Sequence, residues 1–596
     1  MNIQLLKNIF SLLNTKEKRK LKLLFIVFIV TGIFEIAGIA SIAPFMAVVS
    51  SPEIIQDNHY LNTIYMYFKF VNTNDFLVVL GVIVILLLVF SNAITAFTVW
   101  QLTSFANNQS HSLSVNLFNS YLSSSYEFFL NNNSSTLEKN VVSEVFRAVS
   151  GVMLPLLLLA VKSIIVLFIL VLLMVVNPFI TFTAIFILGG LYLLMYRFIR
   201  NYLIQIGESF IEADSNRYKF VGESLNGIKN IKLNGNELEF VERYSKPSKL
   251  HAKFATQNSL ITQMPRYLVE TISFSGIVGL IVYFIYQGDG AEDVIPLISI
   301  FALAAYRIAP AIQQIYHSFS QIKYTLPAMN LLFSDIKPTY ENMSDDPINK
   351  DSLKFKKSMA LNNIGFKYLN SDRNSLSNIN VEIAANTTIG IVGETGSGKT
   401  TLVDLILGLI VPSSGNILID GNILDKKNLK QWQNNIGYVP QDIFLLDDSI
   451  TRNIAFSASE ESIPIEVIKF VCKIAGISEF IELLPDGYET VVGERGAKLS
   501  GGQIQRIGIA RALYKNPSVI VFDEATSALD NITEKVVMEA VNNLSHKKTI
   551  IMISHRISSI RNCDIIHLMD NGSIVDSGSY DELMVSSILF QKLVNS

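Results

Sequence analysis

Cysteine, tryptophan and charged residues are all scarce in this chain. Among its 596 residues there are two cysteines and two tryptophans, and only 17% of the residues are charged. Cys472 and Cys563 belong to no CxxC motif or Cys/His cluster, so we infer neither a metal site nor a disulfide framework. The net charge of −3 gives no overall basic field of the kind that binds nucleic acid. We expect two ordinary thiols in a reducing compartment and no nucleic-acid partner.

Hydrophobic residues, in contrast, make up half of the chain, which is too many for an ordinary soluble protein. Long apolar segments occupy the N-terminal half, and short β-branched strands alternate with helical patterns after about residue 350. A polar stretch with two prolines (335–352) lies between the two parts. The sequence therefore predicts four regions, namely an amphipathic N-terminal helix (1–20), a transmembrane domain (21–325), a linker (326–353) and an α/β domain (354–596).

Six segments are long enough to cross a membrane as helices, which needs about 20 apolar residues. They are 21–49, 75–100, 151–176, 179–198, 267–287 and 293–318. The tripeptide "NPF" (177–179) predicts a tight turn between the third and the fourth. The apolar run after residue 20 is too long for a cleavable signal, and residues 4–13 have the spacing of an amphipathic helix on a membrane surface.

Lysine and arginine predict the orientation, because they are enriched in cytoplasmic segments. The run "KEKRKLK" (16–22) and the segment 199–266 are rich in both, whereas the loop 50–74 has only Lys69 and the loop 287–293 has none. Both termini should therefore be cytoplasmic, and the helical patterns of 101–150 and 199–266 should extend the spans into the cytoplasm. Aromatic residues in 59–70 predict a short helix at the outer interface, either as an anchor or in contact with substrate.

The stretch "IGIVGETGSGKTT" (389–401) has the pattern GxxxxGK[ST] of a phosphate-binding loop. Its glycines allow backbone N–H groups to approach the phosphates of ATP, Lys399 should meet the β and γ oxygens, and Thr400 should hold Mg²⁺. We predict that the nucleotide is contacted by Gly393, Glu394, Thr395, Gly396, Ser397, Gly398, Lys399, Thr400 and Thr401.

A second motif, "SVIVFDEATSALD" (518–530), predicts a buried strand that ends in two carboxylates. Asp523 is placed to hold Mg²⁺, directly or through water, and Glu524 to polarise the attacking water. The sequence thus predicts an ATPase that uses ATP and Mg²⁺.

Between these motifs lies "LSGGQIQRIGIARAL" (499–513), which resembles the signature motif of ABC-transporter nucleotide-binding domains. Tyr368 in "FKY" resembles the residue that stacks on adenine, and Gln441 in "YVPQD" resembles the residue that contacts Mg²⁺ and water. "VVGERG" (491–496) resembles the X-loop of exporters, "SALD" (527–530) the D-loop, and His555 in "ISHR" the switch histidine on the γ-phosphate. The resemblance implies six transmembrane helices with long cytoplasmic extensions, followed by an α/β P-loop NTPase domain with a helical subdomain.

In ABC transporters the signature motif of one domain contacts the γ-phosphate held by the other domain. The resemblance assigns this contact to Ser500, Gly501, Gly502 and Gln503. One chain has one phosphate loop and one signature motif, so a homodimer with twelve membrane helices is the simplest complete assembly.

Two further segments, 125–145 and 222–240, resemble the intracellular loops of ABC exporters, which dock on the ATPase domains near Gln441.

Ionisable residues in the apolar spans are the guide to the substrate, since they are costly in hydrocarbon. They are Glu35, Lys162, Glu270 and Arg307. Arg266 lies at the inner edge, one helical turn from Glu270, and we expect these two to pair. "FEIAGIASIAPF" (34–45) and the "YR" before a proline at 306–310 resemble flippases of lipid-linked oligosaccharides in the bacterial cytoplasmic membrane. Arg266 and Arg307 would face the pyrophosphate, but Ser91 and the rest of the second span supply no further arginine.

Several alternatives remain open at this stage. Glu35 either closes a network inside the bundle, for example with Lys162, or contacts substrate or couples protons. Arg307 either contacts substrate or pairs with Glu35 or Glu270 as packing. The same scaffold also exports peptides, lipids or hydrophobic drugs. The six spans and the lack of a long coiled coil exclude a non-transporting ATPase that uses the signature motif for chromosome or repair work. A channel or receptor regulator should show a degenerate Glu524 or cytoplasmic insertions, and neither is present.

Overall fold

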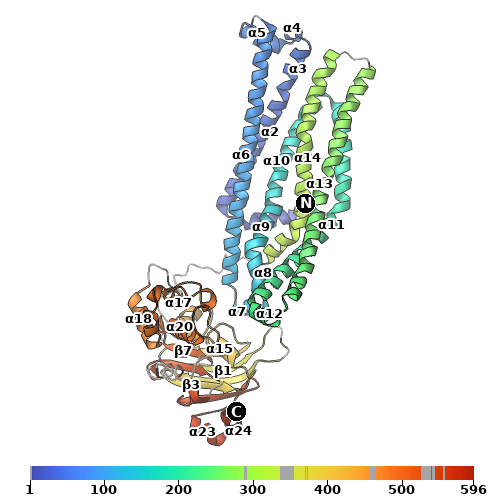
Figure 1. Ribbon diagram of the computed structural model, residues 1–596. Coiled ribbons are helices and arrows are strands. Elements are labelled where there is room, and N and C mark those ends of the chain that lie inside the picture. The colour runs from blue at the N-terminus through green and yellow to red at the C-terminus, as the bar shows by residue number, and fades with distance from the viewer. Residues whose placement is uncertain are drawn as a thin grey trace. The chain divides into compact units, whose positions relative to one another are not determined.

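The computed structural model describes residues 3–70, 72–287, 291–335, 355–368, 371, 373–456, 458, 463–524, 534, 539, 544–554 and 557–595. The chain divides into two compact units. The first comprises Met1–Ser124 and Phe128–Asn342, and the second comprises Ser125–Glu127 and Met343–Ser596. The first unit is built from helices, and the second combines sheets with helices (Figure 1).

Long helices dominate the N-terminal part of the chain. They are α1 (Ile3–Leu12), α2 (Thr15–Ala40), α3 (Ile42–Ser50), α4 (Ile54–Asp57), α5 (His59–Tyr67), α6 (Thr73–Leu122), α7 (Tyr126–Asn131), α8 (Ser134–Lys139), α9 (Val145–Ala148), α10 (Leu154–Val176), α11 (Pro178–Asn226), α12 (Ile228–Asn234), α13 (Glu237–Gln287) and α14 (Ala291–Asp335). Two π-helical turns, Asn140–Glu144 and Val149–Met153, join α8, α9 and α10. At about 1.5 Å per residue, α11 is about 74 Å long, so it extends well beyond a hydrocarbon core of about 30 Å, as predicted.

Five stretches among the described residues are long and apolar enough to cross a membrane. They are Thr15–Ser50, Thr73–Leu122, Ser134–Val176, Pro178–Asn226 and Ile298–Asp335. They contain four of the six predicted spans in full, and the last of them covers the predicted span 293–318 from Ile298 onward. The other predicted span, 267–287, is the C-terminal part of α13, where the side chains of several residues lie outside the described set.

Local chemistry explains where these helices begin and bend. α2 starts at a capping box, in which the Asn14 side chain accepts from the Glu17 amide and the Glu17 carboxylate accepts from the Asn14 amide. The first span breaks at Ser41, because Pro44 has no N–H to continue the ladder. The predicted turn between the third and fourth spans is confirmed, with the Asn177 side chain capping α11.

The amphipathic segment 4–13 is helical as predicted, and Ile9 and Leu13 are buried in the core of this unit. The predicted outer helix of 59–70 forms as α5. The last helix, however, extends through Asp335 into the segment that we predicted as linker. Its continuation follows from packing, since Met329 and Leu332 are fully buried against the other helices. The rest of the predicted linker lies outside the described residues.

The second unit contains two sheets. An antiparallel sheet has the order β2-β1-β4-β5, with β1 (Ser358–Phe366), β2 (Leu376–Ala384), β4 (Ser414–Ile419) and β5 (Asn422–Ile423). A larger sheet has the order β10-β9-β3-β8-β7-β6, with β3 (Thr388–Gly393), β6 (Ile436–Val439), β7 (Val519–Asp523), β8 (Thr549–Ile553), β9 (Ile565–Asp570) and β10 (Ser573–Gly578). Pairing from β9 to β6 is parallel, so the predicted α/β fold is confirmed.

Parallel pairing places the carboxyl ends of neighbouring strands at one edge of the sheet. The phosphate loop follows β3, Asp523 ends β7 with Glu524 directly after it, and Gln441 follows β6. The predicted His555 would follow β8 at the same edge, but it lies outside the described residues, as does the predicted D-loop (527–530).

Helices complete the second unit, and α17, α18 and α20 gather in one region of it, as expected for a helical subdomain (Figure 1). The helices are α15 (Lys399–Ile406), α16 (Leu429–Gln433), α17 (Ile450–Ile454), α18 (Ile465–Ile474), α19 (Ser478–Glu482), α20 (Gly501–Leu513), α22 (Ile557–Ile560), α23 (Tyr580–Ser586) and α24 (Ile588–Asn595).

Candidate functional site

The phosphate loop is a tight turn between β3 and α15. Gly398 at the start of α15 has a φ of +99°, and a Cβ there would lie 2.8 Å from the Ser375 carbonyl oxygen, so only glycine fits. The Lys399 ammonium donates to the carbonyl oxygens of Gly393 and Glu394, both at 2.8 Å. Burial lowers the pKa of Lys399, while the carboxylates of Glu524 and Asp523 act against that shift. The loop thus holds its cation close to the end of β7.

Two hydroxyl groups of this loop are suited to ATP and Mg²⁺. Ser397 is 3% exposed, and its buried Oγ has no hydrogen-bond partner among the described residues. Such a group normally has a partner, and a phosphate oxygen would supply one. Thr400, one residue into α15, is exposed and available for a cation.

The predicted adenine platform lies next to the same loop. The Tyr368 hydroxyl is 3.2 Å from Thr401 Oγ1, at the beginning of α15. Its ring packs edge-on against Phe366, with 4.9 Å between the centroids. An aromatic face is therefore held within reach of a nucleotide whose phosphates occupy the loop.

The predicted catalytic carboxylate meets the predicted Q-loop glutamine. Gln441 Nε2 donates to Glu524 Oε2 at 2.8 Å, and the Glu524 amide donates to the Ile553 carbonyl oxygen of β8. Glu524 has a φ of +48°, a conformation that non-glycine residues adopt mainly where surrounding contacts impose it. The structure thus brings together a carboxylate and an amide that the sequence separates by 83 residues.

Asp523 is the better candidate for a metal ligand. Burial raises the pKa of Asp523, and the negative charge of Glu524 contributes to the rise, whereas a hydrogen bond from Tyr438 lowers it. A cation would relieve this crowding of negative charge. Mg²⁺ keeps several of its waters and binds mainly to substrate phosphates, so it needs few ligands from the protein. The side-chain oxygens of the three predicted ligands, Thr400, Gln441 and Asp523, are of the kind that Mg²⁺ prefers.

The signature motif begins helix α20. Ser500 is its N-cap and forms a capping box with Gln503, in which each side chain accepts from the other backbone amide. Ser500 and Gly501 are exposed, and a Cβ on Gly501 would meet nothing within 4 Å. The positive end of α20 is therefore open to an anion.

Sequence reasoning missed several residues that support this region. Arg511 at the end of α20 donates to the carbonyl oxygens of Asn453 and Phe444, and burial lowers its pKa to about 10. This ties the signature helix to the segment after Gln441. Asp404 on α15 is a second omission, and burial raises its pKa to about 6, with Asp523 adding to the rise. Position in a quoted motif would have identified Arg511, which lies in "LSGGQIQRIGIARAL", and Tyr438, which lies in "YVPQD", but not Asp404.

Glu35 lies inside the helical unit and is 5% exposed. Its Oε2 is 3.2 Å from Arg307 Nη1, and its Oε1 accepts from Thr95 at 3.1 Å. Arg307 also donates to Asn92 Oδ1 at 3.1 Å. The predicted network is thus present, and its cationic partner is Arg307 of α14, the second of the partners that we considered. Our suggestion of Lys162 was wrong in that respect, since Lys162 forms no ion pair within the described residues, although the charges of Glu35 and Arg307 act on it.

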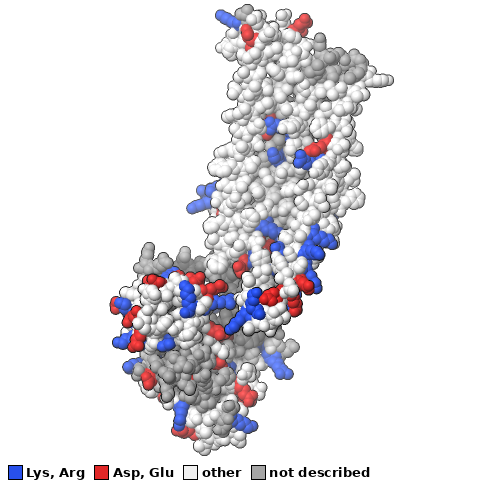
Figure 2. Space-filling view, in the orientation of Figure 1, with Lys and Arg blue, Asp and Glu red and all other residues white. Residues whose placement is uncertain are grey.

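The other predicted intramembrane pair is confirmed. Arg266 Nε donates to Glu270 Oε1 at 2.6 Å, one turn along α13. Figure 2 shows few charged side chains along the middle of the long helices, whereas charged side chains gather toward their ends. Arg266 and Arg307 line one pocket of about 570 Å³ between α13 and α14. Its other lining residues are Val269, Glu270, Phe274, Ile277, Ala302, Ala305, Tyr306, Ala309, Pro310 and Gln313. The two predicted substrate arginines therefore share a mostly apolar cavity, each with an acidic partner.

Comparison with known proteins identifies both units. Residues 21–264 match the model of the ABC transporter transmembrane region, and residues 376–527 match the ABC transporter model. A bacterial Atm1-family ABC exporter, solved with ATP bound, superposes with a TM-score of 0.81 over 96% of this chain and 98% of that chain. At 24% identity this likeness establishes the fold alone.

Curated relatives share more sequence over part of the chain. The leukotoxin translocation ATP-binding protein LktB of Mannheimia haemolytica is 34% identical over 388 residues, which is 64% of this chain and 53% of that protein. LktB of Bibersteinia trehalosi is 39% identical over 293 residues, which is 49% of this chain and 40% of that protein. The chain thus spans about half the length of the curated relatives that it matches, or less. Because the two ABC transporter models cover most of its length in the family's order, the chain belongs to the ABC transporters, as a multi-pass half-transporter of the exporter fold in which one membrane domain is fused to one ATPase domain.

Proposed function

We propose that two copies of this half-transporter form an ATP-driven exporter in the bacterial cytoplasmic membrane, with both termini and the ATPase domains in the cytoplasm. The observation that best supports ATP hydrolysis is the hydrogen bond from Gln441 to Glu524. The charge of Glu524 also acts on Lys399, so the carboxylate, the amide and the phosphate-binding cation belong to one site.

Each residue of this site has a role in the proposed reaction. Ser397, Lys399 and the backbone N–H groups of the loop bind the phosphates of ATP. Thr400, Gln441 and Asp523 would hold Mg²⁺, which neutralises phosphate charge when bound. Glu524 polarises the attacking water, with Gln441 fixing its carboxylate. Tyr368 stacks on adenine. His555, outside the described residues, is assigned to the γ-phosphate by the resemblance.

The ATP site is composite in this proposal. The N-terminus of α20 is exposed at Ser500 and Gly501, which suits a contact with a phosphate held by another copy. The Ser500 hydroxyl and the Gly502 N–H would donate to the γ-phosphate, and the dipole of α20 would add to the attraction. This requires a homodimer, because a chain has a single motif of each kind.

The substrate that we propose is an amphipathic molecule with polar groups, bound at the pocket between α13 and α14. A lipid-linked oligosaccharide needs arginines available for its pyrophosphate. Arg307 is already paired with Glu35, and Arg266 with Glu270. A pocket lined by arginines that are each paired with a glutamate suits a substrate with both hydrogen-bond donors and acceptors. The relatives, which are named as toxin-translocation proteins, favour a polypeptide. We therefore favour peptide export, with the lipid-linked oligosaccharide as the second candidate.

Substrate-stimulated ATP hydrolysis in proteoliposomes tests this proposal. Peptides of mixed apolar and charged composition should stimulate the full-length chain, and a polyprenyl-pyrophosphate oligosaccharide should not. Gln313→Leu, inside the pocket, should weaken stimulation by peptide. Gln314→Leu is the matched control, since the neighbouring Gln314 does not line the pocket. Stimulation by the oligosaccharide alone would reverse our order of the two substrates, and equal effects of both glutamine variants would refute the pocket.

A further inference from the structure

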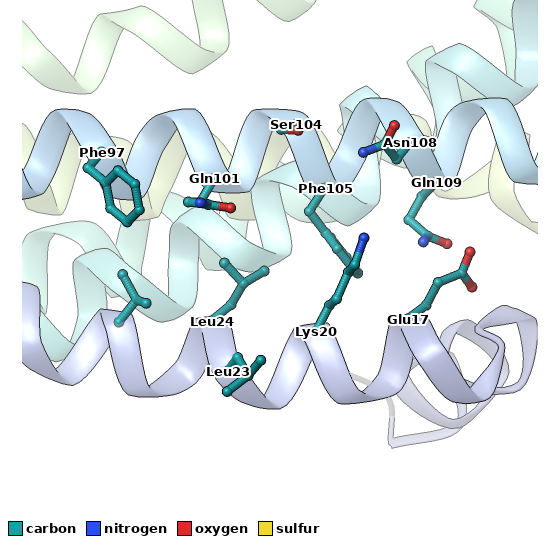
Figure 3. A pocket seen from close by; sticks show the side chains of 11 residues that line it. Glu17, Lys20, Leu23, Leu24, Phe97, Gln101, Ser104, Phe105, Asn108 and Gln109 are labelled. Carbon is teal, nitrogen blue, oxygen red and sulfur yellow. The ribbon is translucent and has the colours of Figure 1, made fainter.

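Helices α2 and α6 enclose a second pocket of about 370 Å³ (Figure 3). One part of its lining is apolar and comprises Leu23, Leu24, Val27, Phe97 and Phe105. The other part is polar and comprises Glu17, Lys20, Gln101, Ser104, Asn108 and Gln109. The apolar part continues into the membrane-spanning residues of α2, and the polar part adjoins its basic N-terminal turns. The pocket therefore crosses the boundary between hydrocarbon and water.

Gln109 is the strongest sign that this pocket is a binding site. Its side chain is 2% exposed and lines the pocket, and its Oε1 has no hydrogen-bond partner among the described residues. Figure 3 shows the Gln109 amide facing the Glu17 carboxylate at the polar end. A buried acceptor without a donor is costly, so a ligand that brings an N–H or O–H group to this end would be stabilised.

The charges of the pocket define the ligand further. Lys20 extends from α2 toward α6 (Figure 3) and offers a cation, while Glu17 offers a carboxylate one turn away. Glu17 Oε2 already accepts the Asn14 amide, which fixes the carboxylate at this position. A zwitterionic group therefore complements the site, with a phosphate beside Lys20 and a donor beside Glu17 and Gln109. The exposed Leu23 and Phe97 leave an apolar surface for a hydrocarbon chain.

We propose that this pocket binds one phospholipid whose head group carries both a phosphate and N–H donors, as in phosphatidylethanolamine. The phosphate lies at Lys20, the ammonium at Glu17 and Gln109 Oε1, and one acyl chain along Leu23, Val27 and Phe97. Neighbouring basic residues of the run 16–22 increase the local concentration of phosphate head groups. The site does not depend on the nature of the exported substrate.

Native mass spectrometry of the delipidated full-length chain, titrated with defined lipids, tests this assignment. Phosphatidylethanolamine should be retained about five-fold more tightly than phosphatidylcholine, because methylation removes the donors for Glu17 and Gln109. Gln109→Leu should abolish that preference without loss of folding, since it removes an unpaired buried oxygen. Free phosphoethanolamine should not compete at similar concentration, because it has no acyl chain. Equal retention of both lipids by the unaltered chain, or equal competition by phosphoethanolamine, would overturn the proposal.

Matched variants separate this pocket from general attraction to a basic surface. Lys20→Gln should weaken retention about five-fold, and Lys22→Gln, on the same helix but outside the pocket, should not. Equal effects of the two variants would refute a specific site. A second copy of the chain is the other possible occupant. Disulfide cross-linking of a Ser104→Cys variant into a dimer would assign the pocket to contact between copies, and the buried Cys472 and Cys563 should not interfere.

Discussion

Replacing Arg307 by glutamine should destabilise the membrane unit, because it leaves Glu35 as an unpaired buried charge. Two unit charges about 4 Å apart interact by about 4 kcal/mol at an effective dielectric constant of about 20. Removal of one partner from a buried pair typically costs about 3–5 kcal/mol. Glu35 is 5% exposed and Arg307 only 19% in its side chain, so this pair belongs to that class. We therefore expect Arg307→Gln to lower the free energy of unfolding by about 3 kcal/mol.

A double-mutant cycle isolates the pair. Glu35→Gln combined with Arg307→Gln should recover most of the loss, because two amides in place of the ions leave no buried charge. The measurement is equilibrium unfolding in mixed detergent micelles, with far-UV circular dichroism as the probe of helix content. Arg243→Gln is the control: its ion pair with Glu239 lies outside the predicted spans and is exposed to solvent, so stability should change little. The reasoning fails if Arg307→Gln costs less than about 1 kcal/mol, or if the double variant is as unstable as the sum of the single variants.

The same double variant separates packing from transport. Basal ATP hydrolysis should persist, because the ATPase residues belong to the other unit. Stimulation by substrate should fall, since Arg307 lines the pocket between α13 and α14. A stable double variant with full stimulation would show that Arg307 serves the fold alone.

Four further predictions concern the ATPase unit. Glu524→Gln should bind ATP and trap a closed dimer with hydrolysis reduced at least about 100-fold, as expected when a general base is lost; a rate within a few-fold of the unaltered chain would exclude Glu524 as the base. Ser500→Arg should abolish turnover while each monomer still binds ATP by equilibrium dialysis, and retained turnover would argue against a composite site. Tyr368→Ala should weaken ATP binding by about 1–3 kcal/mol if the ring stacks on adenine, whereas unchanged affinity would rule that out. Asp404 has a pKa raised from 3.8 to about 6 in the folded chain, so its charged form is disfavoured there. The folded chain therefore loses stability as pH rises from about 4 to 6. Without nucleotide, Asp404→Asn should raise the melting temperature at pH 8 and leave it unchanged at pH 4.

The sequence alone was sufficient for the order of the parts and for the ATP motifs. Apolar runs of membrane-spanning length predicted five of the spans now seen as described helices, because that signal depends on local composition. The phosphate loop was also predictable, since Gly398 and Lys399 act within a single turn between a strand and a helix. Even the capping of α20 by Ser500 follows from neighbouring residues.

The tertiary structure decided the contacts between residues far apart in the chain. Glu35 pairs with Arg307 across 272 positions, and not with Lys162, because the packing of α2 and α14 sets that distance. The hydrogen bond between Gln441 and Glu524 likewise depends on the parallel pairing of β6 with β7. The burial of Gln109 in the pocket between α2 and α6 had no sequence signal, since a glutamine in a long helix is ordinarily solvent-exposed. Composition and short motifs act over a few residues, whereas charge pairing and burial depend on which surfaces the helices and strands present to one another.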